Sequence, residues 1–248
     1  MKGNPFLGAS YLLRGFSLIL KPGLRSYVIV PLLINVVLFS VLIVVGAQQF
    51  NQLMLWLLPE WPTWLSWLLW PLFAVTISGV AFFTFLSVCN LIGAPFNALL
   101  AERVEEKLRG CVQQSPFQLA QVLRTFIPTL ISEINKILYF ALRALPLLLL
   151  FLIPGVNIIA SVLWMIFSAW ILALEYADFP MANHDIRFTE QRILLQKKRL
   201  MVWGFGAAIL LLLMIPLVNF LAMPTAVAGA TAMWLEHFDQ TLEKTSDA

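Results

Sequence analysis

The sequence predicts an all-α integral membrane protein forming a single membrane domain, 1–248, with two spanning helices, two partly inserted helical hairpins and a cytoplasmic amphipathic helical region. Hydrophobic residues make up 60% of the chain and charged residues only 12%. Soluble domains carry about 25% charged residues, so this chain has too little charge to cover a surface that faces water. Long uncharged stretches and a run of sequence that occurs twice lead to the same fold class.

Two uncharged stretches in the first half of the chain are long enough to cross a bilayer. They cover residues 26–59 and 61–101. A helix needs about 20 apolar residues to cross a hydrocarbon core of roughly 30 Å. We therefore expect one spanning helix at 27–47 and a second at 67–90.

The second half of the chain contains one pattern twice. Residues 147–157 read LLLLFLIPGVN, and residues 210–219 read LLLLMIPLVN. Basic residues precede each run, and the apolar stretch after it ends near a tryptophan and an E-x-x-D pair. Because proline and glycine interrupt regular structure, each copy predicts two helical arms that meet at a turn. The expected hairpins cover residues 143–175 and 199–235.

Both hairpins are expected to enter the membrane only partly. Their shorter arms reach about 15 to 20 Å at 1.5 Å per residue, which is less than the hydrocarbon core. Backbone groups released at the turns cost several kcal/mol each if they face lipid. Asn157 and Asn219, placed directly after the turns, are suited to bonding those groups. The alternative is that each segment is one spanning helix with a proline kink.

The polar stretch after the second spanning helix predicts a cytoplasmic helical region at 95–135. Lysine and arginine flank the first two spanning helices and are absent from the loop between them, so both outer ends are cytoplasmic. We expect a turn at Pro95 to end the second spanning helix, and a further helix to begin at Ser115 and Pro116. The helix between them is amphipathic and ends at Gly110. Its apolar face comprises Phe96, Leu100, Val104 and Leu108.

The segment KPGLRS at residues 21–26, directly before the first spanning helix, carries the strongest chemical candidate. A glycine turn that opens a helix offers free backbone N–H groups and the positive end of the helix dipole. Arg25 adds a fixed charge with several donors, and Ser26 adds a hydroxyl donor. These groups fit an anion. The structural alternative is an anchor for topology or lipid headgroups, the usual role of a basic residue at the cytoplasmic end of a membrane helix.

An acidic cluster with one histidine follows the first hairpin, at Glu175, Asp178, His184 and Asp185. It lacks the H-E-x-x-H spacing of a metalloprotease and fits an interfacial loop better. We therefore predict no metal, no cofactor and no catalytic residue, and no nucleic-acid partner. His237 lies in a polar tail and is expected to be solvated.

Two glycine motifs bear on whether the chain binds a nucleotide. Gly204-x-Gly206 does not follow a strand, so it is more typical of helix packing than of a dinucleotide fingerprint. The chain contains no G-x-x-x-x-G-K-[ST] motif, so it is not itself a P-loop ATPase.

Four long segments resemble the CysZ family of bacterial inner-membrane sulfate permeases, in the same order and from near the N-terminus to about Trp234. The segments are PGLRSYVIVPLLINVVLF at 22–39, NLIGAPFNALLAERVE at 90–105, SAWILALEYADFPMANH at 168–184 and IPLVNFLAMPTAVAGATAMW at 215–234.

The resemblance implies a multi-pass inner-membrane homo-oligomer that takes up sulfate for sulfur assimilation and cysteine biosynthesis, by channel-like or secondary transport. Its partners would be sulfate and membrane lipid. The family's sulfate-binding Gly-Leu/Ile-Arg turn falls on Gly23, Leu24 and Arg25. Some members carry a second arginine where this chain has Ser26. Two alternatives from other classes are a membrane-embedded enzyme that uses the Glu175 to Asp185 cluster, and a scaffold that regulates another transporter.

Overall fold

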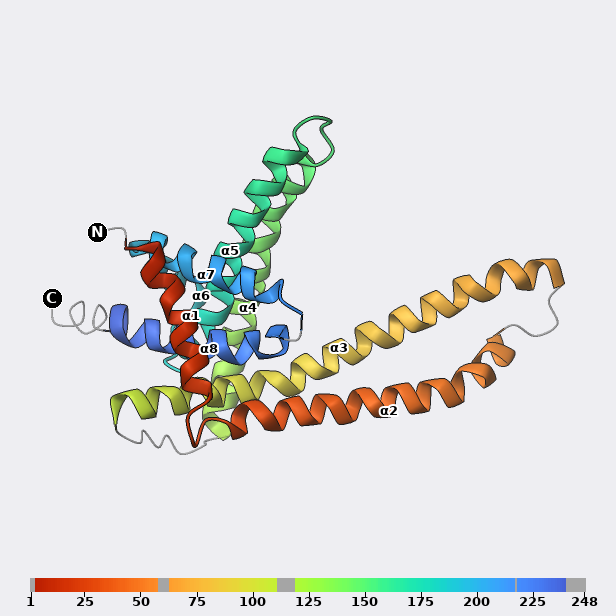
Figure 1. Ribbon diagram of the computed structural model, residues 1–248, viewed down its shortest axis with the longest axis horizontal. Coiled ribbons are helices and arrows are strands. Elements are labelled where there is room, and N and C mark those ends of the chain that lie inside the picture. The colour runs from red at the N-terminus through yellow and green to blue at the C-terminus, as the bar shows by residue number, and fades with distance from the viewer. Residues whose placement is uncertain (1–2, 58–62, 111–118, 217, 240–248) are drawn as a thin grey trace. The chain divides into compact units, whose positions relative to one another are not determined.

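The computed structural model describes residues 3–57, 63–110, 119–216 and 218–239, and every regular element in these ranges is helical. The chain divides into two compact units (Figure 1). The larger unit contains Met1–Arg25 and Asn97–Ala248, and the smaller unit is Ser26–Phe96. The fold class is therefore all-helical, as predicted.

The smaller unit is a pair of long apolar helices. Helix α2 (Ser26–Leu57) and the first part of α3 (Thr63–Arg109) lie side by side (Figure 1). The rings of Phe39 and Phe85 pack between them with centroids 5.5 Å apart. Apolar side chains cover the outside of this pair, including the exposed Val37 and Val75. An apolar exterior suits contact with lipid rather than with water.

The expected helix stop at Pro95 is wrong, because α3 continues through this residue to Arg109. Proline inside a helix removes one hydrogen bond and costs about 3 kcal/mol. The continuation buries Leu100 and Val104 completely, and burial of such side chains contributes roughly 1.5 to 3 kcal/mol each, which offsets that cost. The predicted end at Gly110 is confirmed by its φ of +73° and by its N–H bond to the Glu106 carbonyl. The expected helix start at Ser115 and Pro116 lies outside the described residues.

The core of the larger unit lies among α1 (Pro5–Ile19), α5 (Asn157–Ala182), α7 (Arg199–Leu213) and α8 (Ala222–His237). These helices pack with their backbones in contact. A Cβ on Gly8 would lie 1.9 Å from the Met201 carbonyl oxygen, and one on Gly206 would lie 1.8 Å from that of Ala169. A Cβ on Gly204 would lie 2.0 Å from the Pro5 carbonyl oxygen. The packing role predicted for Gly204-x-Gly206 is therefore confirmed.

Helices α4 (Leu119–Leu150) and α5 form an antiparallel hairpin that projects from this core (Figure 1). Its turn falls at the predicted break, where Gly155 has a φ of +85°. With its amide oriented to match donors with acceptors, Asn157 donates to the carbonyls of Phe151 (3.1 Å) and Ile153 (3.2 Å). This is the role expected for Asn157.

The arms of this hairpin are longer than expected, at 32 and 26 residues. Among the described residues, three helical stretches are long and apolar enough to cross a membrane: Ser26–Val45, Asn157–Ala182 and Val218–His237. Helix α5 is therefore long enough to cross a membrane, in addition to the two spanning helices predicted in the first half of the chain. Length and apolarity do not by themselves distinguish a hairpin arm from a spanning helix.

The second predicted hairpin also breaks at Pro216, the first of its two prolines. Helix α7 ends before Pro216, and the 3₁₀ helix η1 (Val218–Leu221) leads into α8. Pro224 lies in the first turn of α8, where a missing N–H costs little. Helices α7 and α8 pack mainly against α1 and α5 rather than against each other. The short helix α6 (Phe188–Lys197) connects α5 to α7.

Candidate anion-binding site

The candidate turn connects the end of α1 to the start of α2. The Leu24 N–H donates to the Lys21 carbonyl (3.2 Å), and Gly23 has a φ of +90°, which L-residues rarely adopt. Leu24 is buried, so its side chain holds the turn on the protein. The N–H groups of Gly23 and Arg25 donate to no backbone group among the residues that the structure describes. Two backbone donors of the turn therefore remain available.

Arg25 is exposed, and its Nε donates to the Leu20 carbonyl at the end of α1 (2.6 Å). This bond satisfies a carbonyl of the helix C-terminus, where a cation is favourable. It also fixes the plane of the guanidinium and leaves its two terminal nitrogens available as donors. Arg25 therefore has a structural role, and it also retains the donors that an oxyanion would need.

Lys107, near the end of α3, approaches the same turn. Its Nζ donates to the Pro22 carbonyl (2.7 Å) across 85 residues of sequence. Within the described ranges, neither Lys21, Arg25 nor Lys107 forms an ion pair with a carboxylate. Ser26, the fourth predicted residue, is the exposed first residue of α2. The turn thus combines uncompensated positive charge with free donors, which is the chemistry that attracts an anion.

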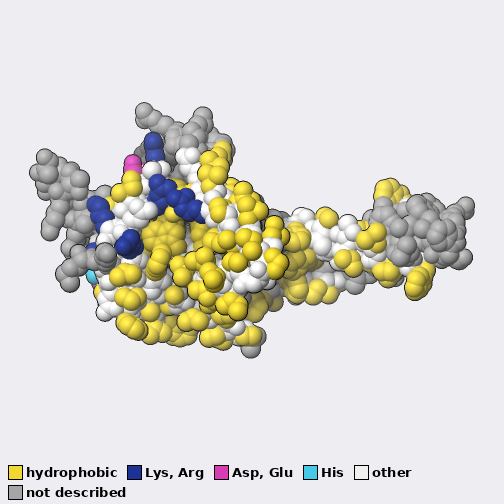
Figure 2. All heavy atoms as spheres, turned by 90° about the horizontal axis from the view of Figure 1, so that it is seen from above, with side chains coloured by type: hydrophobic (Ala, Val, Ile, Leu, Met, Phe, Trp, Pro, Cys, Tyr) yellow, Lys and Arg dark blue, Asp and Glu magenta, His cyan; other side chains and the backbone are white. Residues whose placement is uncertain are grey.

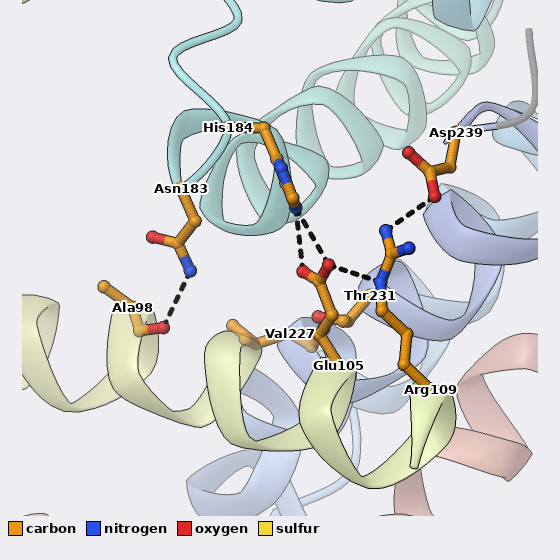
Figure 3. A network of polar contacts seen from close by, with 8 residues as sticks. All are labelled: Ala98, Glu105, Arg109, Asn183, His184, Val227, Thr231 and Asp239. Atoms are coloured by element: carbon orange, nitrogen blue, oxygen red, sulfur yellow. Dashed lines mark hydrogen bonds and ion pairs between the residues drawn. The ribbon is translucent and has the colours of Figure 1, made fainter. Parts of the chain in front are cut away.

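A network of charged side chains joins the end of α3 to residues that follow α5 and α8 (Figure 3). Glu105 on α3 is buried, and both of its oxygens lie within 3.0 Å of the His184 Nε2. Arg109 donates from Nε to Glu105 (2.7 Å) and from a terminal nitrogen to Asp239 (2.6 Å). Asn183 adds a bond to the Ala98 carbonyl (3.1 Å). These bonds hold the end of α3 to the C-terminal ends of α5 and α8.

The network shifts the titration of both partners of its central pair. Burial by itself raises the pKa of Glu105, but the hydrogen bond with His184 and the charges of His184 and Arg109 together lower it below its usual value. The pKa of His184 is raised, chiefly by its hydrogen bond to Glu105, although burial opposes this. The network therefore favours the charged form of each group relative to the same group free in water.

The acidic cluster predicted after the first hairpin does not assemble. Glu175 and Asp178 pair with Lys136 on α4, at 3.6 and 2.8 Å, while His184 turns to Glu105. Asp185 is exposed, with a φ of +57°. In the part of the chain that is described, no group of three or more potential metal ligands comes together. Both E-x-x-D pairs instead bond to bases on other helices, since Glu236 pairs with Arg14 and Asp239 with Arg109.

The expectation that His237 is solvated is wrong. Its Nε2 lies 2.9 Å from the Tyr11 hydroxyl, and its Nδ1 lies 3.2 Å from Lys198 Nζ. The cause is α1, which packs against α8 and brings Tyr11 and Arg14 to the end of that helix.

The sequence did not identify Lys107 as a neighbour of the turn or Glu105 as the partner of His184. In the sequence, Lys107 is one of several charged residues on the polar faces of the amphipathic helix. The sequence signal for Glu105 is its position next to the apolar Val104, and the structure buries both residues. The structure thus brings Gly23, Leu24 and Arg25 together with Lys107 in the larger unit.

These features define the class of the protein. Its apolar helices of spanning length, apolar exterior and sparse charge are those of an all-helical membrane protein.

Comparison with known proteins then gives the family. Residues 11–224 match the family described as "Sulfate transporter CysZ/Etoposide-induced protein 2.4". A Pseudomonas aeruginosa (strain LESB58) protein named "Sulfate transporter CysZ" is 44% identical over 231 residues, which cover 92% of this chain and 94% of the relative. A Vibrio parahaemolyticus protein of the same name is 40% identical over 241 residues, or 93% of this chain and 95% of the relative. This chain belongs to the sulfate transporter CysZ/etoposide-induced protein 2.4 family.

Proposed function

We propose that this protein takes up sulfate across the bacterial inner membrane and so supplies sulfur assimilation and cysteine biosynthesis. The observation that carries the proposal is the 44% identity to a relative named as a sulfate transporter, extending over 92% of the chain. The matched region includes the whole of the candidate turn, residues 21–26.

In this proposal sulfate binds at Gly23, Leu24, Arg25 and Ser26. The free N–H groups of Gly23 and Arg25 and the terminal nitrogens of Arg25 would donate to the sulfate oxygens. Leu24 holds the turn through its buried side chain, and the Ser26 hydroxyl adds a donor. Lys107 supplies a second positive charge next to the turn. A dianion is favoured because uncompensated bases surround it.

The membrane arrangement proposed with this function has two spanning helices, α2 and the first part of α3, and two hairpins whose turns lie at membrane depth. The exposed apolar side chains at the tip of the α4–α5 hairpin support it, including Leu152, Ile153 and Ile158. Single cysteines at Val156 and Val218 should resist a bulky, impermeant thiol reagent added from the side opposite the termini. Ready labelling at those positions would show that the arms cross fully.

Several copies of the chain would build the pathway, because the helical hairpins of one copy leave much apolar surface uncovered. Flux would be channel-like or secondary. Both the homo-oligomer and the mode of flux are parts of this proposal.

Uptake of radiolabelled sulfate into vesicles that hold only this protein tests the function. We expect uptake above that of protein-free vesicles. Channel-like flux would occur with and without an imposed proton gradient, whereas proton-coupled transport would require the gradient. Absence of uptake in both conditions, with correctly inserted protein, would contradict transport and favour a scaffold that acts on another transporter. The enzyme alternative depends on a cluster that does not form, because Glu175 and Asp178 pair with Lys136 while His184 pairs with Glu105.

A further inference from the structure

An open pocket of about 610 Å³ lies where α4, α5 and the α6–α7 junction meet. Its lining is polar at one end, with Arg143, Gln196 and Arg199, and apolar at the other, with Leu147, Leu163 and Phe167. None of its lining residues belongs to the turn at residues 21–26. The pocket is therefore a second candidate binding site.

Each element contributes one face to this pocket, because the lining residues recur at helical spacing. On α4 they are Tyr139, Arg143 and Leu147, on α5 they are Leu163, Phe167 and Trp170, and around the start of α7 they are Gln196, Arg199 and Trp203. Residues three or four positions apart lie on one face of a helix, so α4, α5 and α7 each turn one face to this space, and Gln196 at the end of α6 completes the lining. Because α4 and α5 are antiparallel, the polar end lies near the core and the apolar end towards the hairpin turn.

The polar end of the pocket is positively charged and firmly held. The Arg143 guanidinium stacks over the Tyr139 ring at 3.7 Å, and the Tyr139 hydroxyl accepts a bond from Trp170 Nε1 (3.1 Å). Arg199 is the first residue of α7, where the positive end of the helix dipole adds to its charge. No carboxylate lines the pocket, and among the described residues neither arginine forms an ion pair.

The rest of the pocket has the character of a membrane interface. Trp170 and Trp203 also line the pocket, with ring centroids 6.3 Å apart. Tryptophan favours the headgroup level of a bilayer, where one part of its ring is apolar and the N–H is polar. Figure 2 shows Lys and Arg side chains gathered beside a broad hydrophobic surface on one face of the molecule.

We propose that this pocket binds an anionic phospholipid. The phosphate lies between Arg143 and Arg199, and one acyl chain lies along Leu147, Leu163 and Phe167. A free oxyanion would use only the arginines, and it is much smaller than a pocket in the range of roughly 300 to 1,000 Å³ that holds larger ligands. The inference depends on the proposed membrane insertion of the α4–α5 hairpin and not on sulfate transport.

Lipid binding to the purified, delipidated full-length protein tests this assignment, with native mass spectrometry and thermal unfolding as readouts. Phosphatidylglycerol should bind more tightly than phosphatidylcholine with the same chains. Arg143→Gln and Arg199→Gln should each weaken phosphatidylglycerol binding about tenfold or more, because each removes a charge-assisted contact. Arg187→Gln removes one exposed charge outside the pocket and should leave binding within about twofold.

Three results would overturn the proposal. One is equal binding of phosphatidylglycerol by the wild type and by a folded Arg199→Gln variant, a substitution that breaks no ion pair among the described residues. Another is equal binding of the two lipids. The third is displacement of phosphatidylglycerol by an equal concentration of inorganic phosphate, which would make the pocket a free oxyanion site. Because no readout depends on sulfate, failure here is distinguishable from failure of the transport proposal.

Discussion

The Lys107 ammonium donates a 2.7 Å hydrogen bond to the Pro22 carbonyl, although 85 residues separate the two in the sequence. This bond connects the C-terminal part of α3 to the turn that contains Gly23 and Arg25. It fixes the turn mechanically and places a second positive charge beside the proposed anion.

Lys107→Met should therefore weaken sulfate binding. The substitution keeps the aliphatic stem but removes the charge and one exposed hydrogen bond, worth about 0.5 to 1.5 kcal/mol, or roughly 2- to 12-fold in affinity. Calorimetry with sulfate at fixed salt measures the change. Lys197→Met, which removes an exposed lysine charge from the end of α6, is the matched control and should bind like the wild type. Equal sulfate affinities for Lys107→Met and Lys197→Met would show that Lys107 does not contribute to sulfate binding.

Gly23→Ala should distort the turn without any steric clash. A Cβ at Gly23 meets nothing within 4 Å, so the cost arises only from its φ of +90° and should be about 1 to 2 kcal/mol. Gly23→Asn should lose less, because asparagine tolerates positive φ better than alanine. Gly79 also has open space around it but no positive φ, so Gly79→Ala is the control for a glycine without this constraint. If Gly23→Ala and Gly79→Ala had the same sulfate affinity and the same unfolding temperature, the positive φ at Gly23 would not be required.

The Glu105–His184 pair predicts a pH dependence of stability. The pKa of His184 is raised from 6.5, so its contribution is complete below 6.5 and is lost as the pH rises through the raised value. The pKa of Glu105 is lowered from 4.5, so its contribution is complete above 4.5 and is lost as the pH falls through the lowered value. The pair therefore stabilises the protein most between these limits.

His184→Gln should flatten that dependence. Because His184 is partly exposed and solvent screens the pair, we expect it to contribute about 1 kcal/mol or less, which is at most roughly 2 to 4 °C in unfolding temperature. Thermal unfolding in detergent between about pH 6 and pH 9 should show a fall for the wild type that is smaller for His184→Gln. An identical slope for both proteins would exclude this pair as its source.

Much of the fold was predictable, because helix breaks depend on residues close together in the sequence. Pro154 with Gly155 marks the hairpin turn, and Gly110 marks the end of α3, where positive φ is observed. The apolar positions Leu100 and Val104 predicted a buried face, and both are fully buried. These features depend on residues within one or two helical turns of each other.

The rest depended on contacts between distant segments. No element was expected at residues 5–19, yet α1 forms there and packs against both α7 and α8 in the larger unit. Gly8 of α1 allows close packing against the Met201 backbone, and a sequence pattern does not show that contact. For the same reason Gly23, Leu24 and Arg25 could be picked out from local turn chemistry, whereas Lys107 could not. The helix through Pro95 reflects burial further along the chain rather than the local signal.

Sulfate binding by variants of Arg25 and Ser26 tests the central claim most directly. Arg25→Ala removes a charge-assisted contact worth roughly 1.5 to 3 kcal/mol, or about 10- to over 100-fold in affinity. Arg25→Lys keeps the charge but loses the planar guanidinium, and Ser26→Ala removes one neutral donor worth about 0.5 to 1.5 kcal/mol. Calorimetry at fixed salt should give the affinity order wild type, Ser26→Ala, Arg25→Lys, Arg25→Ala, with an unfolding temperature for each variant to show that it is folded. A folded Arg25→Ala variant that binds sulfate as tightly as the wild type would contradict the account and place the anion site elsewhere in the protein.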